Sequence, residues 1–331
     1  MTLTDIIEEN STITKIKLTD SIKTQIKLLQ KYEGTITKHD LNLLGGKISQ
    51  LNNQSLYEEF NQIVKDIKEV RIQGAENIAI AAIKAYHLQP FKKTISLLES
   101  LRPTEPCLRN TLKFVSKSSK NITLALKHFE DSDKKIVEYG TRKIKDNMII
   151  FTHCHSSTVT KILIAAKKQK KNFQVYNTET RPLFQGRITA KELAAANIPV
   201  THFVDSAARL AIKEADMVLL GADAITAEGK IINKMGSEMI ADIAQRFDVP
   251  IYICTNSWKF DPKTVFGFEE EIEKRFAREV WKDAPKGVKI NNMAFEIMDH
   301  NLITGIISEL GVSAPEIFIE EVKHNYPWIL K

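Results

Sequence analysis

A thiol and a carboxylate are the residues of this chain best suited to catalysis. Cys154 follows directly after an apolar run at 148–152 and precedes a pattern typical of a helix. A helix N-terminus lowers the pKa of a nearby thiol and favours thiolate chemistry. Asp223 follows a second apolar run, at 217–220. A cysteine and an aspartate at the mouth of one sheet suit proton transfer beside a carbonyl, which is the chemistry of an isomerase or a lyase.

Polar and basic residues that could hold an anion occur at similar positions. The segment 156–158 brings hydroxyl groups and free backbone N–H groups to a predicted helix start, which is a natural phosphate cradle. Asn233, Lys234, Lys259 and Arg102 could add charged or polar partners. Each group also has a simpler explanation, because Ser and Thr are ordinary helix N-caps and a single Lys or Arg is usually a solvated surface charge.

Structural alternatives stay open for the residues that look reactive. Cys154 could be a small buried hydrophobe, and Asp205 could serve only as a helix cap. Adjacent strand residues point to opposite faces, so Cys154 and its two flanking histidines cannot all bind one ion, and we expect no metal site. Cys107 and Cys254 lack a comparable context and are expected to be packing residues. The chain has no dinucleotide fingerprint, P-loop or nucleophile elbow, so we expect no cofactor.

The elements that must position these residues are indicated by short β-branched runs after about residue 146. The runs alternate with helical patterns, which predicts a parallel sheet with right-handed crossovers. In such a sheet, ligands bind beyond the carboxyl ends of the strands, and a polar segment follows each of the first runs. The predicted strands are 148–152, 173–176, 200–204, 217–220, 251–254 and 302–307, the helices 158–168, 191–196, 206–213 and 237–247, and the polar segments 153–158, 179–187, 205–206, 221–223 and 256–259.

The first 145 residues indicate helices, with almost no strand-like alternation. Apolar positions recur at three- and four-residue steps in several stretches, one of which stops at Arg102-Pro103. The stretches are 63–70, 78–85, 97–101, 122–129 and 136–144. We therefore predict an α/β chain with a helical extension at 1–60, an N-terminal helical domain at 61–145, and a Rossmann-like, doubly wound parallel-sheet domain at 146–331.

Composition excludes several classes of protein. The 331 residues are 43% hydrophobic and 27% charged, which fits a folded soluble chain of about two domains. No apolar run is long enough for a membrane helix, and the N-terminus lacks the pattern of a secretory signal. Three cysteines are too few for a disulfide framework, so we expect a cytoplasmic setting. The net charge of +6 comes without a basic stripe interleaved with aromatics, which argues against nucleic acid binding.

Several motifs occur together in an order that is known from one superfamily. The motifs are Thr152-His153-Cys154-His155-Ser156, Thr178-Glu179-Thr180-Arg181-Pro182, Gln185-Gly186-Arg187-Ile188-Thr189-Ala190-Lys191-Glu192-Leu193, Val204-Asp205-Ser206-Ala207-Ala208-Arg209, Gly221-Ala222-Asp223 and Ile232-Asn233-Lys234. Over residues 66–331 the chain resembles the superfamily that joins the alpha, beta and delta regulatory subunits of translation initiation factor 2B to two sugar-phosphate isomerases. These isomerases act on methylthioribose 1-phosphate and ribose 1,5-bisphosphate. Residues 1–60 have no counterpart in this resemblance.

The thiol motif is most similar to that of the ribose-1,5-bisphosphate isomerase branch. That branch has Thr-His-Cys-His-Ser, whereas the methylthioribose enzymes typically have Thr-His-Cys-Asn-Ala-Gly and the regulatory subunits usually lack the cysteine. The resemblance implies that Cys154 and Asp223 are the catalytic pair of an aldose–ketose isomerase that forms ribulose 1,5-bisphosphate without a cofactor. It implies a phosphorylated pentose as substrate, and self-association into dimers and, as trimers of dimers, hexamers. The implied substrate contacts are Gln73, Gly74, Ala75, Arg102, Ser156, Ser157, Thr158, Asn233, Lys234 and Lys259.

Two segments depart from the pattern of that branch. Gln73 and Ser157 stand where the isomerase has Arg and Lys, and Glu76 adds an acid where it has Gly. A charged hydrogen bond to phosphate is worth about 1.5–3 kcal/mol, so the loss matters unless Arg71 or Arg109 replaces the missing cations. The alternative hypothesis is a non-catalytic subunit like those of initiation factor 2B, which would bind a sugar phosphate or a nucleotide and a protein partner.

Overall fold

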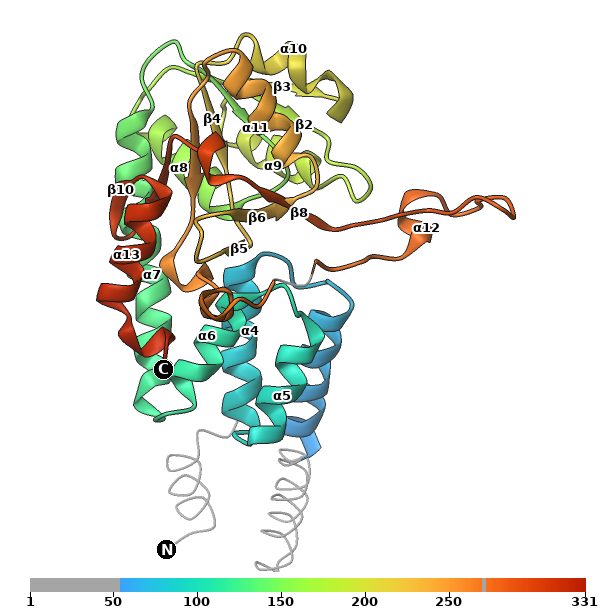
Figure 1. The fold of residues 1–331 in the computed structure, drawn as a ribbon, viewed down its shortest axis with the longest axis vertical. Helices are drawn as coiled ribbons and strands as arrows, with labels where there is room; N and C mark the ends of the chain where they lie inside the picture. Colours follow the sequence, from blue (N-terminus) through green and yellow to red (C-terminus); the bar gives the residue numbers. More distant parts are fainter. Residues whose placement is uncertain (1–53, 270–271) are drawn as a thin grey trace, which may run out of the picture. The chain divides into compact units, whose positions relative to one another are not determined.

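Helices form the N-terminal part of the compact unit Gln62–Lys331 (Figure 1). The computed structural model describes residues 54–269 and 272–331, so the predicted extension at 1–60 lies almost entirely outside the described residues. The predicted domain boundaries stay predictions. Helix α5 ends at Leu101, as predicted, because Arg102 precedes a proline and is disfavoured in the helical conformation. The helices are α4 (Ala75–Leu88), α5 (Lys92–Leu101), α6 (Pro106–Val115) and α7 (Lys120–Lys143).

Helix α7 is one helix of 24 residues, where the apolar pattern predicted two separate segments. Its buried stripe passes through Phe129, Ser132 and Ile136, and the polar Ser132 interrupts the pattern between the two segments. Helix α6 has no counterpart in the prediction, because its buried face includes the polar Arg109 and Asn110. Burial here follows tertiary contacts that an apolar stripe does not reveal.

The main sheet has seven strands in the order β10-β9-β7-β4-β1-β2-β3. Neighbouring strands pair in parallel, except that β10 pairs antiparallel with β9. The predicted fold class, a helical N-terminal part followed by a doubly wound sheet, is therefore confirmed. The strands are β1 (Ile149–Thr152), β2 (Gln174–Thr178), β3 (Val200–Phe203), β4 (Met217–Leu220), β7 (Ile251–Cys254), β9 (Gly305–Ser308) and β10 (Gly311–Ser313).

The direction in which the chain adds strands reverses between β1 and β4. From β1 it passes through α8 (Ser157–Lys168) to β2 and through α9 (Gln185–Ala195) to β3, then returns through α10 (Ala208–Ile212) to β4. Right-handed crossovers therefore put α8 and α9 on one face of the sheet, and α10 and α11 (Ser237–Arg246) on the other. The ends of β1 and β4 form the topological switch point, where open α/β sheets bind ligands.

Helix α9 begins earlier than predicted. Residues 185–187, predicted as part of a polar segment after a strand, form its first turn. This turn needs Gly186, because a Cβ atom there would lie 1.7 Å from the carbonyl oxygen of Thr178. Asn177 Nδ2 also donates to the carbonyl of Gly186 over 2.7 Å. The start of α9 is therefore held directly against β2.

A second, three-stranded antiparallel sheet has no counterpart in the prediction. Its order is β5-β6-β8, with β5 (Ala224–Ile225), β6 (Ile231–Lys234) and β8 (Phe295–Met298). A turn at residues 227–228 connects β5 to β6, and the following Gly229 has a φ of 79°. Strand β8 pairs with β6 from about sixty residues further along the chain, a distance over which local patterns carry no signal. This small sheet positions Asn233 and Lys234.

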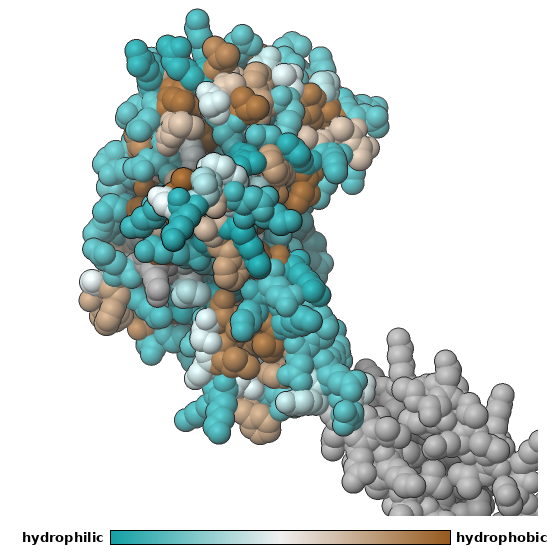
Figure 2. Space-filling model, turned by 90° about the vertical axis from the view of Figure 1, so that its right-hand side faces the viewer, coloured by the Kyte–Doolittle hydropathy of each residue, from teal (hydrophilic) through white to brown (hydrophobic). Residues whose placement is uncertain are grey.

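The main hydrophobic core lies between the sheet and helices α7, α8 and α9, and includes Ile136, Ile162, Leu193 and Leu219. One face of the surface is mostly hydrophilic, with hydrophobic residues in separate patches (Figure 2). No helix in the described ranges is long and apolar enough to cross a membrane. The remaining elements are η1 (Asp205–Ala207), η2 (Ser257–Lys259), η3 (Pro262–Phe266), α12 (Ala277–Val280), η4 (His300–Leu302), α13 (Pro315–Asn325) and η5 (Pro327–Ile329).

Candidate active site

A cavity of about 380 Å³ lies at the carboxyl ends of β1 and β4. The cavity is lined by every residue that the sequence predicted for the site, from both the helical part and the sheet. These residues are Gln73, Gly74, Ala75, Arg102, Cys154, Ser156, Ser157, Thr158, Asp223, Asn233, Lys234 and Lys259. The fold thus brings the predicted set together at the switch point, while the role of each residue stays a prediction.

Cys154 is held in an unusual backbone conformation directly after β1. Its φ is 65°, in the left-handed region that non-glycine residues rarely adopt and that often marks functional sites. Its N–H donates to Thr180 Oγ1 and its carbonyl accepts from Thr189 Oγ1, each over 2.9 Å. The preceding His153 is buried and contacts Thr178 Oγ1 and the carbonyl of Met235 through its two ring nitrogens. His153 therefore supports the loop, and Cys154 faces the cavity.

Burial raises the pKa of the Cys154 thiol to about 11, and the nearby Lys234 opposes this shift. The sequence-based expectation of a lowered pKa is therefore wrong for the free protein. The physical reason is that the desolvation of the thiolate outweighs the benefit of the helix N-terminus, which begins only at Ser157. Cys107 and Cys254 are completely buried, as expected of packing residues.

Asp223 lies after β4, where its N–H donates to the carbonyl of Ile232 over 2.8 Å. Burial raises the pKa of its carboxyl group, while Lys259, Lys234 and Arg102 oppose the shift. A carboxyl group with a raised pKa retains its proton to higher pH and is suited to donate it. The cavity therefore combines a neutral thiol with a carboxyl group whose pKa is raised by burial.

Two buried cations lie beside Asp223. Lys259 is 7% exposed and donates to the carbonyl of Ala222 over 2.7 Å. Arg102 forms ion pairs with Glu105 over 2.9 Å and with Glu273 over 3.3 Å. Its Nη1 atom has no hydrogen-bond partner among the described residues, so this cation retains a donor for a further group.

Two helix N-termini meet at the cavity. Ser156 is the N-cap of α8 and accepts from the N–H of Val159, which confirms the predicted helix start. Gly74 precedes α4 with a φ of 85°. Gly221 lies so close that a Cβ atom would come within 2.7 Å of Ser156 Oγ. Free N–H groups at such helix starts bind anions.

Several charged residues of the cavity were beyond the reach of the sequence patterns. The additional acids are Glu105, Glu273 and Glu279, and the additional cation is Arg275; Glu76 and Arg181, which the sequence analysis already named, line the cavity as well. Arg275 pairs with Glu273 over 3.0 Å and with Glu279 over 2.7 Å. These residues lie outside the apolar patterns that predicted helices and strands, so the only signal in the sequence was the clustering of charged residues in these segments.

Two predicted alternatives receive an answer from the structure. Neither Arg71 nor Arg109 lines the cavity; Arg71 pairs with nearby acids on the surface, and Arg109 pairs with Asp261 over 3.2 Å. The suggested replacement of the missing cations is therefore wrong. Asp205 is not a side-chain helix cap, since its carboxylate accepts from the backbone N–H groups of residues 180 and 181. In the described part of the chain, no three His, Cys, Asp or Glu residues are grouped to hold a metal ion.

Comparison with known proteins places this geometry in a family. The ribose 1,5-bisphosphate isomerase of Thermococcus kodakarensis is 35% identical over 314 residues, which cover 84% of this chain and 98% of that protein. The ribose 1,5-bisphosphate isomerase of Methanocaldococcus jannaschii is 38% identical, with 80% of this chain and 94% of that protein covered. The crystal structure of translation initiation factor eIF-2B from Pyrococcus horikoshii has a TM-score of 0.72 at 27% identity, covering 79% of this chain and 99% of that one.

The family model of the initiation factor 2 subunits matches residues 1–315. The match thus begins before residue 66, where the motif-based resemblance started, and includes the extension that had no counterpart in that resemblance. The superfamily resemblance itself is confirmed. Because the match spans nearly the whole sequence and is supported by relatives that align over most of their length, the chain belongs to the initiation factor 2 subunit family.

Proposed function

We propose that this chain is an aldose–ketose isomerase of sugar phosphates that converts ribose 1,5-bisphosphate into ribulose 1,5-bisphosphate. The observation that carries the proposal is that Cys154 and Asp223 line one cavity from opposite sides of the switch point. The names of the relatives from Thermococcus kodakarensis and Methanocaldococcus jannaschii support the substrate.

The charged groups of the cavity suit a phosphorylated sugar. The N-terminus of α8, with Ser157 and Thr158 in its first turn, would bind phosphate through backbone N–H groups and hydroxyls. Lys234, Lys259 and the free Nη1 of Arg102 would neutralise phosphate charge. The carboxylates beside Arg102 reduce the net positive charge and would favour hydroxyl groups of the sugar as hydrogen-bond donors.

The proposed reaction begins with opening of the sugar ring. Asp223, in its acid form, gives a proton to the ring oxygen as the bond from C1 to that oxygen breaks. Cys154, as thiolate, takes the proton from C2, and the electrons of that C–H bond form a double bond between C1 and C2. The C2 hydroxyl then returns a proton to Asp223 as the C2 carbonyl forms, and Cys154 gives its proton to C1. The product is an isomer of the substrate, and both residues regain their starting forms.

Each acid–base group in such a scheme contributes a factor of about 100 to 10,000. The thiolate is a minor form in the free protein, because burial raises the pKa of Cys154 to about 11. Lys234, which opposes this shift, is the group placed to stabilise the thiolate. The raised pKa of Asp223 favours its proposed role as the acid.

The direct test is incubation of the purified chain with ribose 1,5-bisphosphate and detection of ribulose 1,5-bisphosphate. Cys154→Ser and Asp223→Asn should abolish turnover while the circular dichroism spectrum stays unchanged. Cys254→Ala, which changes a buried cysteine outside the cavity, and Asp299→Asn, which changes an exposed carboxylate, are the matched controls. Activity close to that of the wild type in either cavity variant would rule out the assigned roles.

The alternative is a non-catalytic regulatory subunit that binds a sugar phosphate or a nucleotide together with a protein partner. The pairing of Arg102 with Glu273 favours it, because this pairing uses part of the charge available to a second phosphate. The same assay separates the two functions when methylthioribose 1-phosphate is tested in parallel. Turnover of neither sugar phosphate, with binding of either one retained, would support the regulatory subunit.

The proposal includes self-association through the sheet domain into a dimer, and into a hexamer as a trimer of dimers. Light scattering of the purified full-length chain measures the molar mass directly. A monomer at micromolar concentration would contradict this part of the proposal and leave the isomerase assay as an independent test.

A further inference from the structure

A buried carboxylate that the proposed reaction does not use lies behind the cavity. Glu309 follows directly after β9 and is 5% exposed. Within the described ranges its ion-pair partner is His128, with Nε2 at 4.0 Å from Oε1. Burial lowers the pKa of His128 to about 4, so this ring is neutral at physiological pH. A buried acid without a charged partner is costly, and its surroundings indicate what it holds in place.

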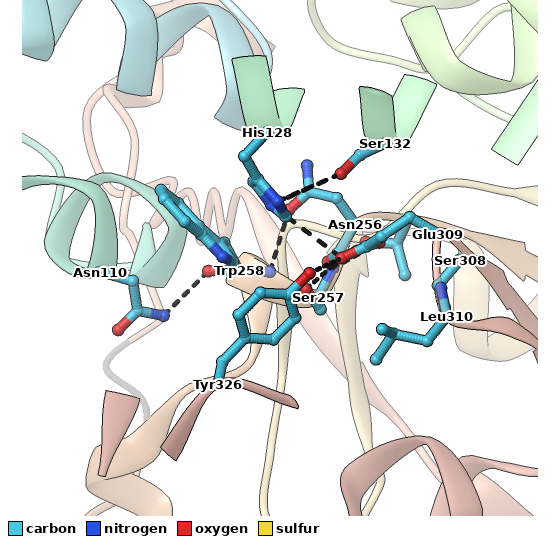
Figure 3. Close-up of polar contacts among 11 residues, drawn as sticks. Asn110, His128, Ser132, Asn256, Ser257, Trp258, Ser308, Glu309, Leu310 and Tyr326 are labelled. Carbon is cyan, nitrogen blue, oxygen red and sulfur yellow. Dashed lines mark hydrogen bonds and ion pairs between the residues drawn. The ribbon is translucent and has the colours of Figure 1, made fainter. Parts of the chain in front are cut away.

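The hydrogen bonds to Glu309 converge from η2 and from the C-terminal segment (Figure 3). The backbone N–H of Ser257 lies 3.3 Å from Oε1 and 3.1 Å from Oε2. The hydroxyl of Ser257 donates to Oε1 as well, and Tyr326 donates its hydroxyl to the same oxygen over 3.3 Å. Glu309 therefore accepts both polar hydrogens of Ser257, which is the first residue of η2.

The short turn η2 is held from its other side too. The ring of Trp258 stacks on His128 with centroids 4.2 Å apart. Asn110 Nδ2 donates to the carbonyl groups of Trp258 and Phe260 over 2.9 and 2.8 Å. These contacts fix the backbone of the turn in the interior, and all three residues of η2 are buried.

The last residue of η2 is Lys259, which enters the cavity. Its Nζ donates to the carbonyl of Ala222, next to Asp223, and its charge is the leading influence that lowers the pKa of the Asp223 carboxyl group. A lysine side chain has several freely rotating bonds. The position of its ammonium group therefore depends on the position and direction of the backbone that carries the side chain. A continuous chain of contacts thus leads from Glu309 through Ser257 to Lys259 and Asp223.

We propose that Glu309 is a positioning residue of the active site: by binding both polar hydrogens of Ser257 it sets the place of Lys259 against Asp223. This inference deepens the proposed function, because it rests on the roles given there to Lys259 and Asp223. Glu309 does not line the cavity, so it touches no substrate. Its effect passes through η2 alone.

The test follows the titration of Asp223, which needs no turnover. The full-length chain is labelled with 13C at the aspartate carboxyl groups, and the Asp223 signal is assigned by its loss in Asp223→Asn. Besides Lys259, the charged groups that influence this carboxyl are Lys234, Arg102, Glu273 and Glu105, and the variants leave all four unchanged. An opposite charge close by lowers the pKa of a carboxyl by about 1–3 units.

Glu309→Gln keeps the size of the side chain but replaces one of the two acceptor oxygens by a donor amide, so a single oxygen is left to accept from Ser257 N–H and Oγ–H. We expect the Asp223 midpoint to rise by about one pH unit, which is a tenfold gain in proton affinity. Lys259→Met should raise the Asp223 midpoint at least as much. In the double variant, Glu309→Gln should change the proton affinity of Asp223 by less than about threefold beyond the effect of Lys259→Met, since the effects of coupled residues are not additive. Tyr326→Phe removes the Tyr326 hydrogen bond to Glu309 but keeps the aromatic ring that packs edge-on against Trp258 of η2. It should leave the Asp223 midpoint within about 0.3 pH unit, which is twofold in proton affinity.

A folded Glu309→Gln variant with an unchanged Asp223 midpoint would overturn the proposal, and so would an effect that adds fully to that of Lys259→Met. If Glu309→Gln does not fold, Ser257→Ala is the test variant, because it removes one of the hydrogen bonds to Glu309. It should raise the Asp223 midpoint by at least about 0.5 pH unit, which is a threefold gain in proton affinity. No shift in Ser257→Ala would likewise overturn it. Absence of isomerase activity in the wild type would contradict the proposed function alone, since the titration would still report whether Glu309 positions Lys259.

Discussion

The Cys154 thiol should react slowly with alkylating agents in the free protein, and more slowly still without Lys234. Burial raises its pKa from 9.0 to about 11, and each unit is a tenfold change in the thiolate fraction. Alkylation at pH 8 should therefore be about a hundredfold slower than that of an unburied cysteine. Lys234 is the leading influence that opposes the shift. A neighbouring charge shifts a pKa by about 1–3 units, and we take the lower end of this range because Lys234 is only partly buried. Lys234→Met should therefore raise the pKa of Cys154 by about one unit and slow alkylation by a further factor of about ten.

The assay is the rate of carbamidomethylation by iodoacetamide between pH 7 and 11, followed by mass spectrometry of the peptide that contains Cys154. The completely buried Cys107 and Cys254 report unfolding in the same sample, because they should stay unmodified in the native protein. Lys230→Met is the matched control, since Lys230 directly precedes β6, which carries Lys234, but pairs with Glu228 and does not line the cavity. A wild-type midpoint near 8.5, or equal rates in Lys234→Met and the wild type, would refute the argument that burial dominates the thiol.

Two further variants test the packing and the electrostatics of the site. Gly186→Ala should destabilise the protein by about 1–3 kcal/mol or more, because the new Cβ would lie 1.7 Å from the carbonyl oxygen of Thr178. Urea unfolding measures the change in the free energy of unfolding, and a change near zero would contradict the close approach of the two segments. Glu105→Gln should flatten the dependence of the free energy of unfolding on pH. Burial raises the pKa of the Glu105 carboxyl group from 4.5 to about 8 in the folded protein. Between these two pH values the folded wild type holds a proton that the unfolded chain releases, so its stability falls as pH rises from about 4.5 to 8. Urea unfolding at pH 5 and pH 8 should show the wild type losing stability relative to Glu105→Gln, and parallel curves would contradict the raised pKa.

The strands β4 and β7 were predictable because strands covered on both faces are uninterrupted apolar runs, whereas the edge strand β10 had no counterpart in the prediction. Met217–Leu220 and Ile251–Cys254 match β4 and β7 at both ends. The small sheet was not predictable, since β5 has two residues and β8 reaches its partner from far along the chain. Helix α7 shows the same limit, because one polar residue in its buried stripe, Ser132, was enough to divide it in the prediction.

The membership of the site was largely predictable, and its electrostatics were not. Local segments after β1 and β4 carried recognisable motifs, and parallel topology placed their ends together. The acid Glu273, which pairs with Arg102, gave no signal because the two residues are more than 160 positions apart in the chain.

The sequence by itself determined the alternation of strands and helices in the main sheet and the identity of the residues at its carboxyl ends, because hydrophobic periodicity and strand-end position are local properties of a chain. Only the tertiary structure decided how those residues titrate and what holds them. Desolvation and pairing depend on which atoms surround a group, so burial reverses the expected pKa shift of Cys154. For the same reason the support of Lys259 by Glu309 becomes visible only when β7 and β9 lie side by side.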